Sequence, residues 1–358
     1  MLNGIKILDL SRLLPGPACT SFLRSMGAQV DRVESHKGQL TRVLPPKKDG
    51  VGAFYAANNR GKRSLAINFR HPDSAKLLIR LLAGYDVLVE GFKPGTLEAM
   101  GLVPAALQER YPKLIIARIS GFGQTGPWAS RVGHDINYIG LSGILAAQKN
   151  DETGYSLPSA QVADISGAMT GAMAICAALV ERSRTQIGRV IDISLTESAM
   201  LMFGSTITGH LSSQQNPNPG QETLTGGSSF YGTYQCSDQK WISVAPLEPK
   251  FQQVLLRVAG SLDRGTLTAL FLSKPQAHWV KVLTDACVAP VLHVSDLPEH
   301  PQHKARQTIA NGFVELPFFH RTEQVPKLGE HSMDILRDGG FSADEINSYC
   351  MKKLIVVP

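Results

Sequence analysis

Three side chains of this sequence have the types that proton transfer at a carbon atom requires. His134 lies in the segment Gly-His-Asp-Ile-Asn-Tyr, Asp164 lies in Gln-Val-Ala-Asp-Ile-Ser-Gly, and Glu248 lies in Ala-Pro-Leu-Glu-Pro-Lys-Phe. Histidine is the side chain whose ordinary pKa is closest to neutrality, which suits a general base. A carboxylic acid can return a proton from the opposite face only if burial or a neighbouring charge raises its pKa. The combination predicts a base, a carboxylate that holds it, and an opposing acid.

His134 and its neighbour also have a structural interpretation. A histidine in a loop, outside any periodic apolar stripe, is more often a hydrogen-bonded structural residue than a catalyst. Asp135 is suited to cap the N-terminus of a helix that begins at Ile136. This interpretation explains Asp135 but leaves His134 without a role.

The two other acids have structural alternatives as well. Asp164 is suited to cap a helix over residues 165–180, where the positive end of the helix dipole would lower the pKa of its carboxyl group. A role as an acid therefore requires a larger opposing effect, such as desolvation. Glu248 ends an apolar run before Pro249, so we expect it to be either exposed at a turn or buried with a partner.

Strand and helix patterns alternate through the first half of the chain. Apolar runs predict strands at residues 4–10, 29–34, 65–69, 86–90 and 114–120. Helices are expected between the Pro15-Gly16-Pro17 break and Gly27, at 72–83 with Pro72 in the first helical position, and over 167–180 as a tightly packed internal helix. This alternation predicts an α/β fold with an open, doubly wound, Rossmann-like sheet.

The second half of the chain has a different pattern. Residues 212–229 are rich in Gln, Asn, Pro, Gly and Ser, which is typical of a linker or loop. A β-hairpin is expected over 230–245, followed by helices at 251–258 and 276–283 and a strand at 289–293. We therefore predict a large, discontinuous α/β domain from residues 1–195 and 310–358, a linker at 196–229, and a smaller α+β domain at 230–309.

The composition narrows the class of protein. Hydrophobic residues make up 43% of the 358 residues and charged residues 18%, which is typical of a soluble globular enzyme. No run approaches the roughly 18 apolar residues of a membrane helix, and no secretory leader is visible, so we expect a cytoplasmic protein without a membrane partner. The net charge of +6 favours an anionic partner. Because the basic residues are scattered, a phosphate-bearing small molecule fits better than nucleic acid, and a merely basic surface is the alternative.

Motifs for metals and common cofactors are weak or missing. The five cysteines include no Cys-x-x-Cys pair, and His300 and His303 lack a third ligand, so no metal site is expected. Residues 121–126 match G-x-G-x-x-G, but Pro127 and Trp128 follow them, whereas a dinucleotide fingerprint opens a helix in the first β-α-β unit. These glycines are expected to form a tight turn near the site, and no nicotinamide or other separate cofactor is predicted.

These motifs together resemble one known family. The Pro15-Gly16-Pro17 segment and residues 61–65, 120–125, 133–138, 188–192 and 248–251 resemble family III CoA-transferases, and within that family the racemases of α-methylacyl-CoA thioesters. The resemblance covers nearly the whole chain. It departs from the racemase pattern at Ser35, where an arginine for CoA is usual, and in the segment before Asp164.

The resemblance implies roles for individual residues. His134 becomes a catalytic base oriented by Glu248, Asp164 becomes the base on the other face, and the chain forms an interlocked homodimer. The CoA moiety belongs to the substrate, so no further cofactor is implied. The resemblance implies substrate contacts for Ile67, Asn68, Phe69, Arg70, Lys93, Gly133, Asp135, Asn137 and Tyr138. Charge alone suggests a further contact at Arg60, in the polar and basic turn at residues 59–64, for which a solvated loop is the alternative.

Three functions remain open on the sequence. The first is a cofactor-free racemase or epimerase of 2-methyl-branched acyl-CoA thioesters, acting by 1,1-proton transfer. The second is a CoA-transferase in which Asp164 is a nucleophile that forms a mixed anhydride and then an aspartyl-CoA thioester. The third is a CoA-binding protein without catalysis, against which the presence of His134, Asp164 and Glu248 argues. The fold alone does not choose among them.

Overall fold

The structure is a computed structural model that describes residues 1–150, 154–322 and 324–357. The chain divides into two compact units, and each is described by itself. The first unit comprises Met1–Ile144, Pro158–Gly204 and Glu315–Pro358, and the second comprises Leu145–Leu157 and Ser205–Val314.

A seven-stranded sheet forms the centre of the first unit. Its spatial order is β10 (Val190–Ser194), β7 (Ile115–Ser120), β6 (Val87–Glu90), β1 (Lys6–Asp9), β2 (Gln29–Ser35), β5 (Arg63–Ile67) and β16 (Ile355–Val356). The six strands from β10 to β5 pair in parallel, and β16 pairs with β5 in the antiparallel direction. The parallel strands have the order 3-2-1-4-5-6 by chain position, the order of doubly wound dinucleotide-binding folds. The predicted α/β fold with a mainly parallel sheet is confirmed.

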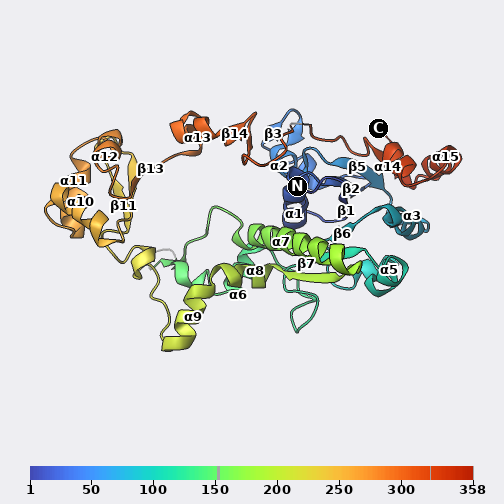
Figure 1. The fold of residues 1–358 in the computed structure, drawn as a ribbon, viewed down its shortest axis with the longest axis horizontal. Helices are drawn as coiled ribbons and strands as arrows, with labels where there is room; N and C mark the ends of the chain where they lie inside the picture. Colours follow the sequence, from blue (N-terminus) through green and yellow to red (C-terminus); the bar gives the residue numbers. More distant parts are fainter. Residues whose placement is uncertain (151–153, 323, 358) are drawn as a thin grey trace. The chain divides into compact units, whose positions relative to one another are not determined.

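Helices cover both faces of this sheet, so its central strands are buried on both sides, as in other parallel sheets. One face carries a leucine-rich core between the strands and α3, α5, α14 and α15, and Figure 1 shows the C-terminal helices α14 and α15 in this layer near α3. On the other face α1 and α7 pack against each other and against the strands. The helices of this unit are α1 (Pro15–Ser25), α2 (Ala53–Asn59), α3 (Ser74–Leu81), α4 (Thr96–Ala99), α5 (Pro104–Arg110), α6 (Asp135–Leu141), α7 (Val162–Thr185), α8 (Leu195–Met202), α14 (Ser332–Asp338) and α15 (Ala343–Met351).

Several helix boundaries differ from the expectation. Pro15-Gly16-Pro17 forms the first turn of α1, since a proline there loses no helical hydrogen bond. Pro72 lies in a turn in which the Asp73 amide donates to His71, so α3 begins only at Ser74. The residues expected as a linker begin with a helix, because the Ser194 hydroxyl accepts from the Glu197 amide and caps α8.

Helix α7 is long and apolar enough, by length and composition alone, to cross a membrane. Its small residues nevertheless pack closely inside the first unit: a Cβ added at Gly171 would lie only 3.2 Å from the Cys19 sulfur of α1, and Gly167 lies against Leu195. Such packing is typical of a core helix in a globular protein. The expected internal helix therefore exists and is longer at both ends than predicted.

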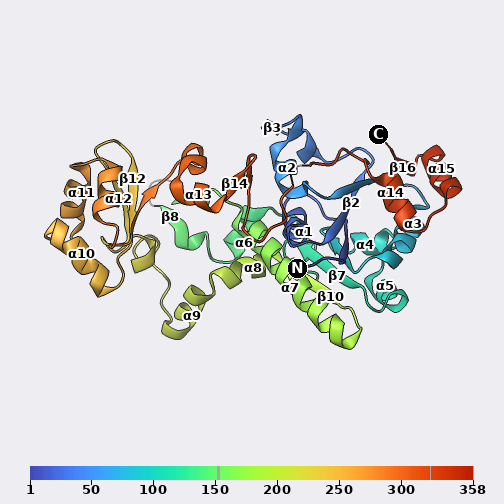
Figure 2. The ribbon, with the colours of Figure 1, turned by 45° about the horizontal axis from the view of Figure 1, so that its top comes forward.

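The second unit is a smaller α+β structure (Figure 2). Its sheet has the order β11 (Gly232–Gln235), β12 (Trp241–Val244) and β13 (Val288–Val291), and both pairings are antiparallel, which confirms the expected hairpin. Its core includes Tyr234, Phe271 and Trp279. The helices are α9 (Gly204–Ser213), α10 (Pro249–Ala259), α11 (Arg264–Leu272), α12 (Gln276–Val282) and α13 (Pro301–Arg306), of which α11, capped by Asp263, was not predicted. Two short hairpins of this unit are β8 (Lys149–Asn150) with β9 (Gly154–Tyr155) and β14 (Ile309–Ala310) with β15 (Phe313–Val314), and a third, β3 (Lys47–Lys48) with β4 (Val51–Gly52), belongs to the first unit.

Candidate active site

The sheet topology determines where a ligand is expected to bind in the first unit. From β1 the chain proceeds in one direction through β2 and β5, and then in the other direction through β6, β7 and β10. At such a reversal the loops that follow the two central strands separate and leave a crevice at the carboxyl edge of the sheet. A cavity of about 710 Å³ lies there, lined by residues that follow β1 (Arg12, Leu13 and Pro15) and β6 (Gly91–Pro94 and Thr96), and by Ser120 at the end of β7 with the following Gly121.

His134 and Asp164 both line this cavity, although thirty residues separate them in the sequence. They come from the N-terminal ends of α6 and α7, two helices that pack against each other. His134 has extended backbone angles and immediately precedes α6. Its backbone amide donates to Asn137 Oδ1 at 3.0 Å, which fixes the start of the helix and leaves the imidazole exposed.

Tyr138 anchors the loop that carries His134. Its hydroxyl donates to the carbonyl oxygen of Gly133, and its ring makes an edge contact with Phe122 at 5.1 Å between centroids. Gly121 passes so close to this ring that an added Cβ would lie 2.3 Å from it. The expected turn role of the G-x-G-x-x-G segment is thus explained, since its first glycine makes room for Tyr138 and no helix follows it before α6 in the described chain.

Asp135 caps a helix, but a different one from that expected. Its Oδ1 accepts from the backbone amides of Ala163 at 2.7 Å and Asp164 at 3.0 Å, so this residue of α6 caps α7. Asp164 is then not the cap of its own helix, which begins at Val162. The carboxylate of Asp135 therefore compensates the positive end of α7 and lies close to Asp164.

The carboxyl group of Asp164 is shifted toward its neutral form. Burial raises the pKa of Asp164 to about 7, and the negative charge of Asp135 contributes in the same direction. Desolvation and a like charge thus outweigh the helix dipole, which would have lowered the pKa. The same desolvation, together with Asp164 and Asp135, raises the pKa of Tyr138 to about 12. A carboxylic acid that changes protonation near pH 7 therefore lines the cavity alongside an imidazole.

Besides His134 and Asp164, the cavity is lined by apolar, neutral polar and cationic residues. Arg12, Lys93 and Arg131 line it, and Arg131 lies over the Trp128 ring at 3.9 Å. Asp164 is the single carboxylate among the described residues of the lining. An anionic ligand is therefore favoured here, and Arg12 and Arg131 are lining residues that the sequence did not single out, because an isolated arginine in a loop carries no spacing signal.

The structure brings together only some of the residues expected to contact a substrate. Lys93, Gly133, Asn137 and Tyr138 line the cavity. Ile67 is buried at the end of β5, and Asn68–Arg70 form a turn after it, in which Asn68 Oδ1 accepts from the Arg70 amide. Since β5 is parallel to β1 and β6, this turn lies at the same edge of the sheet.

Arg60 has a structural role, and Glu248 belongs to the other unit. Arg60 is buried and pairs with Glu315 and the Thr322 carbonyl, so its guanidinium holds the C-terminal segment within the first unit and does not line the cavity. Glu248 belongs to the second unit, where it is exposed and immediately precedes α10. Its position fits one of the two alternatives, exposure at a turn.

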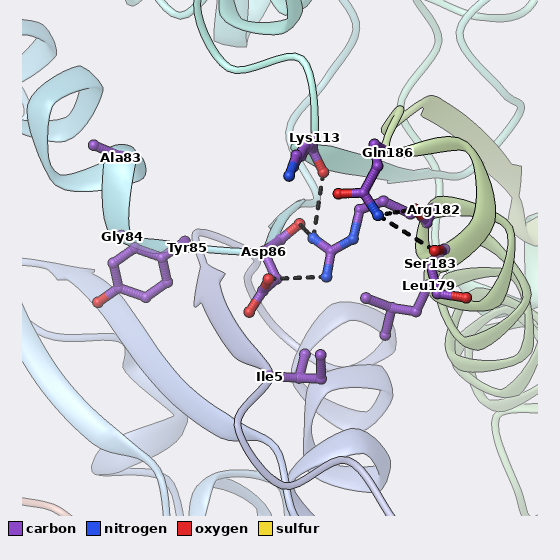
Figure 3. Close-up of a pocket in the computed structure, with 10 residues that line it drawn as sticks. All are labelled: Ile5, Ala83, Gly84, Tyr85, Asp86, Lys113, Leu179, Arg182, Ser183 and Gln186. Carbon is purple, nitrogen blue, oxygen red and sulfur yellow. Dashed lines mark hydrogen bonds and ion pairs between the residues drawn. The ribbon is translucent and has the colours of Figure 1, made fainter.

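A second cavity, of about 570 Å³, lies at the opposite edge of the sheet, among residues that precede β1, β6 and β7 (Figure 3). The Arg182 guanidinium points to Asp86, with Nη2 2.9 Å from Asp86 Oδ1, and Nη1 donates to the Lys113 carbonyl oxygen. These groups join α7 to the amino ends of the strands. The groups with acid–base chemistry lie instead at the carboxyl edge.

Comparisons with known proteins identify the family. The model of CoA-transferase family III matches residues 2–335. This chain belongs to CoA-transferase family III. The resemblance seen in the sequence is thereby confirmed, and the chain is a member of an enzyme family.

Relatives within CoA-transferase family III carry two kinds of name. Human "Alpha-methylacyl-CoA racemase" is 34% identical, with 99% of this chain and 97% of the relative covered. The "(R)-2-hydroxy-4-methylpentanoate CoA-transferase" of Clostridioides difficile is 24% identical, with 99% of each chain covered. Among solved structures, a CAIB/BAIF family protein from Brucella suis matches with a TM-score of 0.84 and 28% identity, over 94% of this chain and 99% of that one.

Proposed function

We propose that this protein is a racemase or epimerase of 2-methyl-branched acyl-CoA thioesters. The observation that carries the proposal is the carboxyl group of Asp164, whose pKa is raised to about 7, in one cavity with His134. In this proposal one of the two groups removes the α-hydrogen as a proton, leaving an enolate. The other group, protonated at that moment, returns a proton to the opposite face, and no acceptor acid takes part. Glu248 is proposed to orient the imidazole.

The shape of the site favours an extended anionic thioester. The ends of β6 and β5 are three strand steps apart, or roughly 14 Å at about 4.8 Å per strand. A ligand that touches both the cavity and the Asn68–Arg70 turn must therefore be long. Lys93, Arg12 and Arg70 supply cations along this edge, which suits the phosphate groups of CoA.

The proposal predicts hydrogen exchange without any second substrate. In heavy water, the protein should exchange the α-hydrogen of a single enantiomer of 2-methylacyl-CoA for deuterium and convert it into the mixture of both. Mass spectrometry and chiral analysis of the released acid measure the two events. The reaction should proceed with a chelator present and without added nicotinamide, because proton transfer needs neither a metal nor a hydride carrier. If the thioester remains unlabelled and keeps its configuration after prolonged incubation, the protein is not a racemase of this substrate.

A CoA-transferase is the second candidate, since it would use the same aspartate and relatives bear that name. A nucleophilic role requires the ionised carboxylate, whereas a pKa near 7 leaves a large neutral fraction, which favours the acid–base role. With a free acid supplied, a transferase would move CoA to it, and hydroxylamine would trap Asp164 as a hydroxamate. Trapping without α-deuterium uptake would select the transferase, and thioester binding without either reaction would select a binding protein.

The surface of α7 supports the proposed homodimer. Met169, Met173 and Val180 are 57%, 61% and 55% exposed and share one face of the helix, and Leu201 and Met202 of α8 are 67% exposed. Exposed apolar side chains that share one face of a helix are typical of protein contacts. We expect sedimentation equilibrium at micromolar concentration to give twice the chain mass, and Met169→Lys with Met173→Lys to weaken the dimer. Met351→Lys, at a more exposed site in α15, is the control, and a folded wild-type monomer would contradict the assignment.

A further inference from the structure

Three charged side chains lie fully buried beneath the loop that follows β1. Asp9 ends β1, Arg32 lies opposite it on β2, and Lys62 precedes β5. Asp9 Oδ2 lies 3.0 Å from Arg32 Nη1 and 3.1 Å from Lys62 Nζ, and all three side chains are 0% exposed. A buried ionic cluster adds little net stability compared with apolar side chains of similar volume. Its directional hydrogen bonds are therefore the feature to explain.

These hydrogen bonds hold both ends of the loop. Asp9 Oδ1 accepts from the Ser11 amide at 2.9 Å, and Arg32 Nη2 donates to the Ser11 carbonyl at 3.1 Å. Lys62 Nζ donates to the Pro17 carbonyl at 2.9 Å and to Thr20 Oγ1 at 2.7 Å. The residues between these two anchors include Arg12, Leu13 and Pro15, which line the cavity that contains His134 and Asp164.

The loop between the anchors has a strained backbone. Leu13 has a backbone φ of +61°, in the left-handed region that residues other than glycine, asparagine and aspartate seldom adopt. Its side chain is 53% exposed, so packing of that side chain does not impose the conformation. Strained backbone of this kind persists only where the surroundings over-determine it, and it concentrates at functional sites. The buried cluster supplies such surroundings on both sides of Leu13.

We propose that Lys62, together with Asp9 and Arg32, is a positioning residue that holds the left-handed turn at Leu13 and thereby sets the cavity wall facing the reacting groups. The cluster touches no substrate. It acts through the backbone of residues 11–17, whose carbonyls at Ser11 and Pro17 it binds. The kinetic part of this inference rests on the proposed function, whereas its structural part concerns the loop alone.

The chain provides a matched control in the neighbouring residue. Arg63 follows Lys62 and points to the opposite face of the sheet, where its Nη2 lies 2.6 Å from Asp31 Oδ2 and its Nη1 lies 2.7 Å from Asp338 Oδ2. Lys62→Met and Arg63→Met therefore each break an ion pair to a buried aspartate, Asp9 on β1 in the first case and Asp31 on β2 in the second. Only the first changes the anchors of the cavity loop.

We expect Lys62→Met to lower kcat on the order of 100-fold, as displacement of a site wall by about 1 Å can, with KM much less changed. Arg63→Met should leave kcat within about threefold of the wild type, well below that displacement effect. Adding Leu13→Gly to Lys62→Met should recover part of the lost kcat, because glycine adopts the turn without the anchors. Leu13→Ile, which changes no buried group, should lower kcat on its own, because β-branching disfavours a positive φ.

Amide hydrogen exchange of residues 11–14, followed by mass spectrometry, provides a readout independent of the reaction. It should accelerate in folded Lys62→Met and stay at the wild-type rate in Arg63→Met. If Lys62→Met does not fold, Leu13→Ile carries the kinetic test. Equal kcat losses in the two methionine variants, no recovery with Leu13→Gly, or unchanged exchange in residues 11–14 would each overturn the proposal. If the wild type catalyses neither racemisation nor CoA transfer, the proposed function fails and amide exchange alone decides the role of Lys62.

Discussion

His134→Ala and Asp164→Asn are each expected to lower the rate of racemisation of 2-methylacyl-CoA by about 10²- to 10⁴-fold. Each change removes a group that carries a proton in the transition state, so kcat and kcat/KM should fall together. The fold should survive both changes, because His134 is exposed and the Asp164 side chain caps no helix. Chiral analysis of the product and α-deuterium incorporation measure the loss.

The two variants should differ in what they retain. In each, the remaining group can still remove and return a proton on its own face, so one enantiomer continues to take up deuterium without inversion. The favoured enantiomer should be opposite in the two variants. Asp334→Asn, a substitution in α14 outside the cavity lining, is the matched control and should keep wild-type rates. If both variants lost deuterium exchange into both enantiomers, His134 and Asp164 would not each serve one face of the α-carbon. If Glu248→Gln kept the wild-type rate of racemisation, Glu248 would not orient the imidazole.

Asp164→Asn is also expected to stabilise the protein at alkaline pH. The folded state raises the pKa of Asp164 from 3.8 to about 7, so between these values it holds a proton that the unfolded chain has lost. The stability of the wild type therefore decreases as the pH rises from about 4 to 7. At 1.36 kcal/mol per pKa unit, discounted for partial exposure, the ionised Asp164 lowers the free energy of unfolding above pH 7 by on the order of 2–4 kcal/mol.

Urea unfolding of both proteins at pH 4.5 and pH 8 tests this expectation. The asparagine variant should exceed the wild type in free energy of unfolding at pH 8, and the difference should shrink toward pH 4.5. A constant difference between the two pH values would show that the raised pKa is not its cause. The expected result is a gain in stability accompanied by a loss of catalysis, which is the trade-off of a strained active-site group.

The sequence predicted the first half of the fold well because buried parallel strands are short apolar runs. Those at Ile115–Ser120 and Val87–Glu90 appear almost as expected. The prediction was wrong at α8, whose Leu195–Met202 segment follows a strand without any Gly or Pro break. It also missed α11, because a polar loop preceded it in a region without clear periodicity.

Site residues were predictable only where a motif or a local pattern identified them. His134 and Asp164 were expected to act together, and they line one cavity. The role of Asp135 was not predictable, because the amides it accepts from lie 28 and 29 residues away in the sequence. Likewise, Arg60 has a basic neighbourhood that favours phosphate binding, but its partner Glu315 lies 255 residues further along the chain.

The edge strand β16 has a consequence for the synthesis of the protein. Ile355 and Val356 pair with Ile67 and Ala66, so these two residues cover the outer edge of β5. Until they leave the ribosome, β5 presents unpaired amides and carbonyls, the kind of edge that pairs with strands of other chains. The second unit, encoded in between, is synthesised entirely before the first can be closed. A nascent or shortened chain without Ile355 and Val356 therefore exposes the edge of β5, to which strands of other chains can pair.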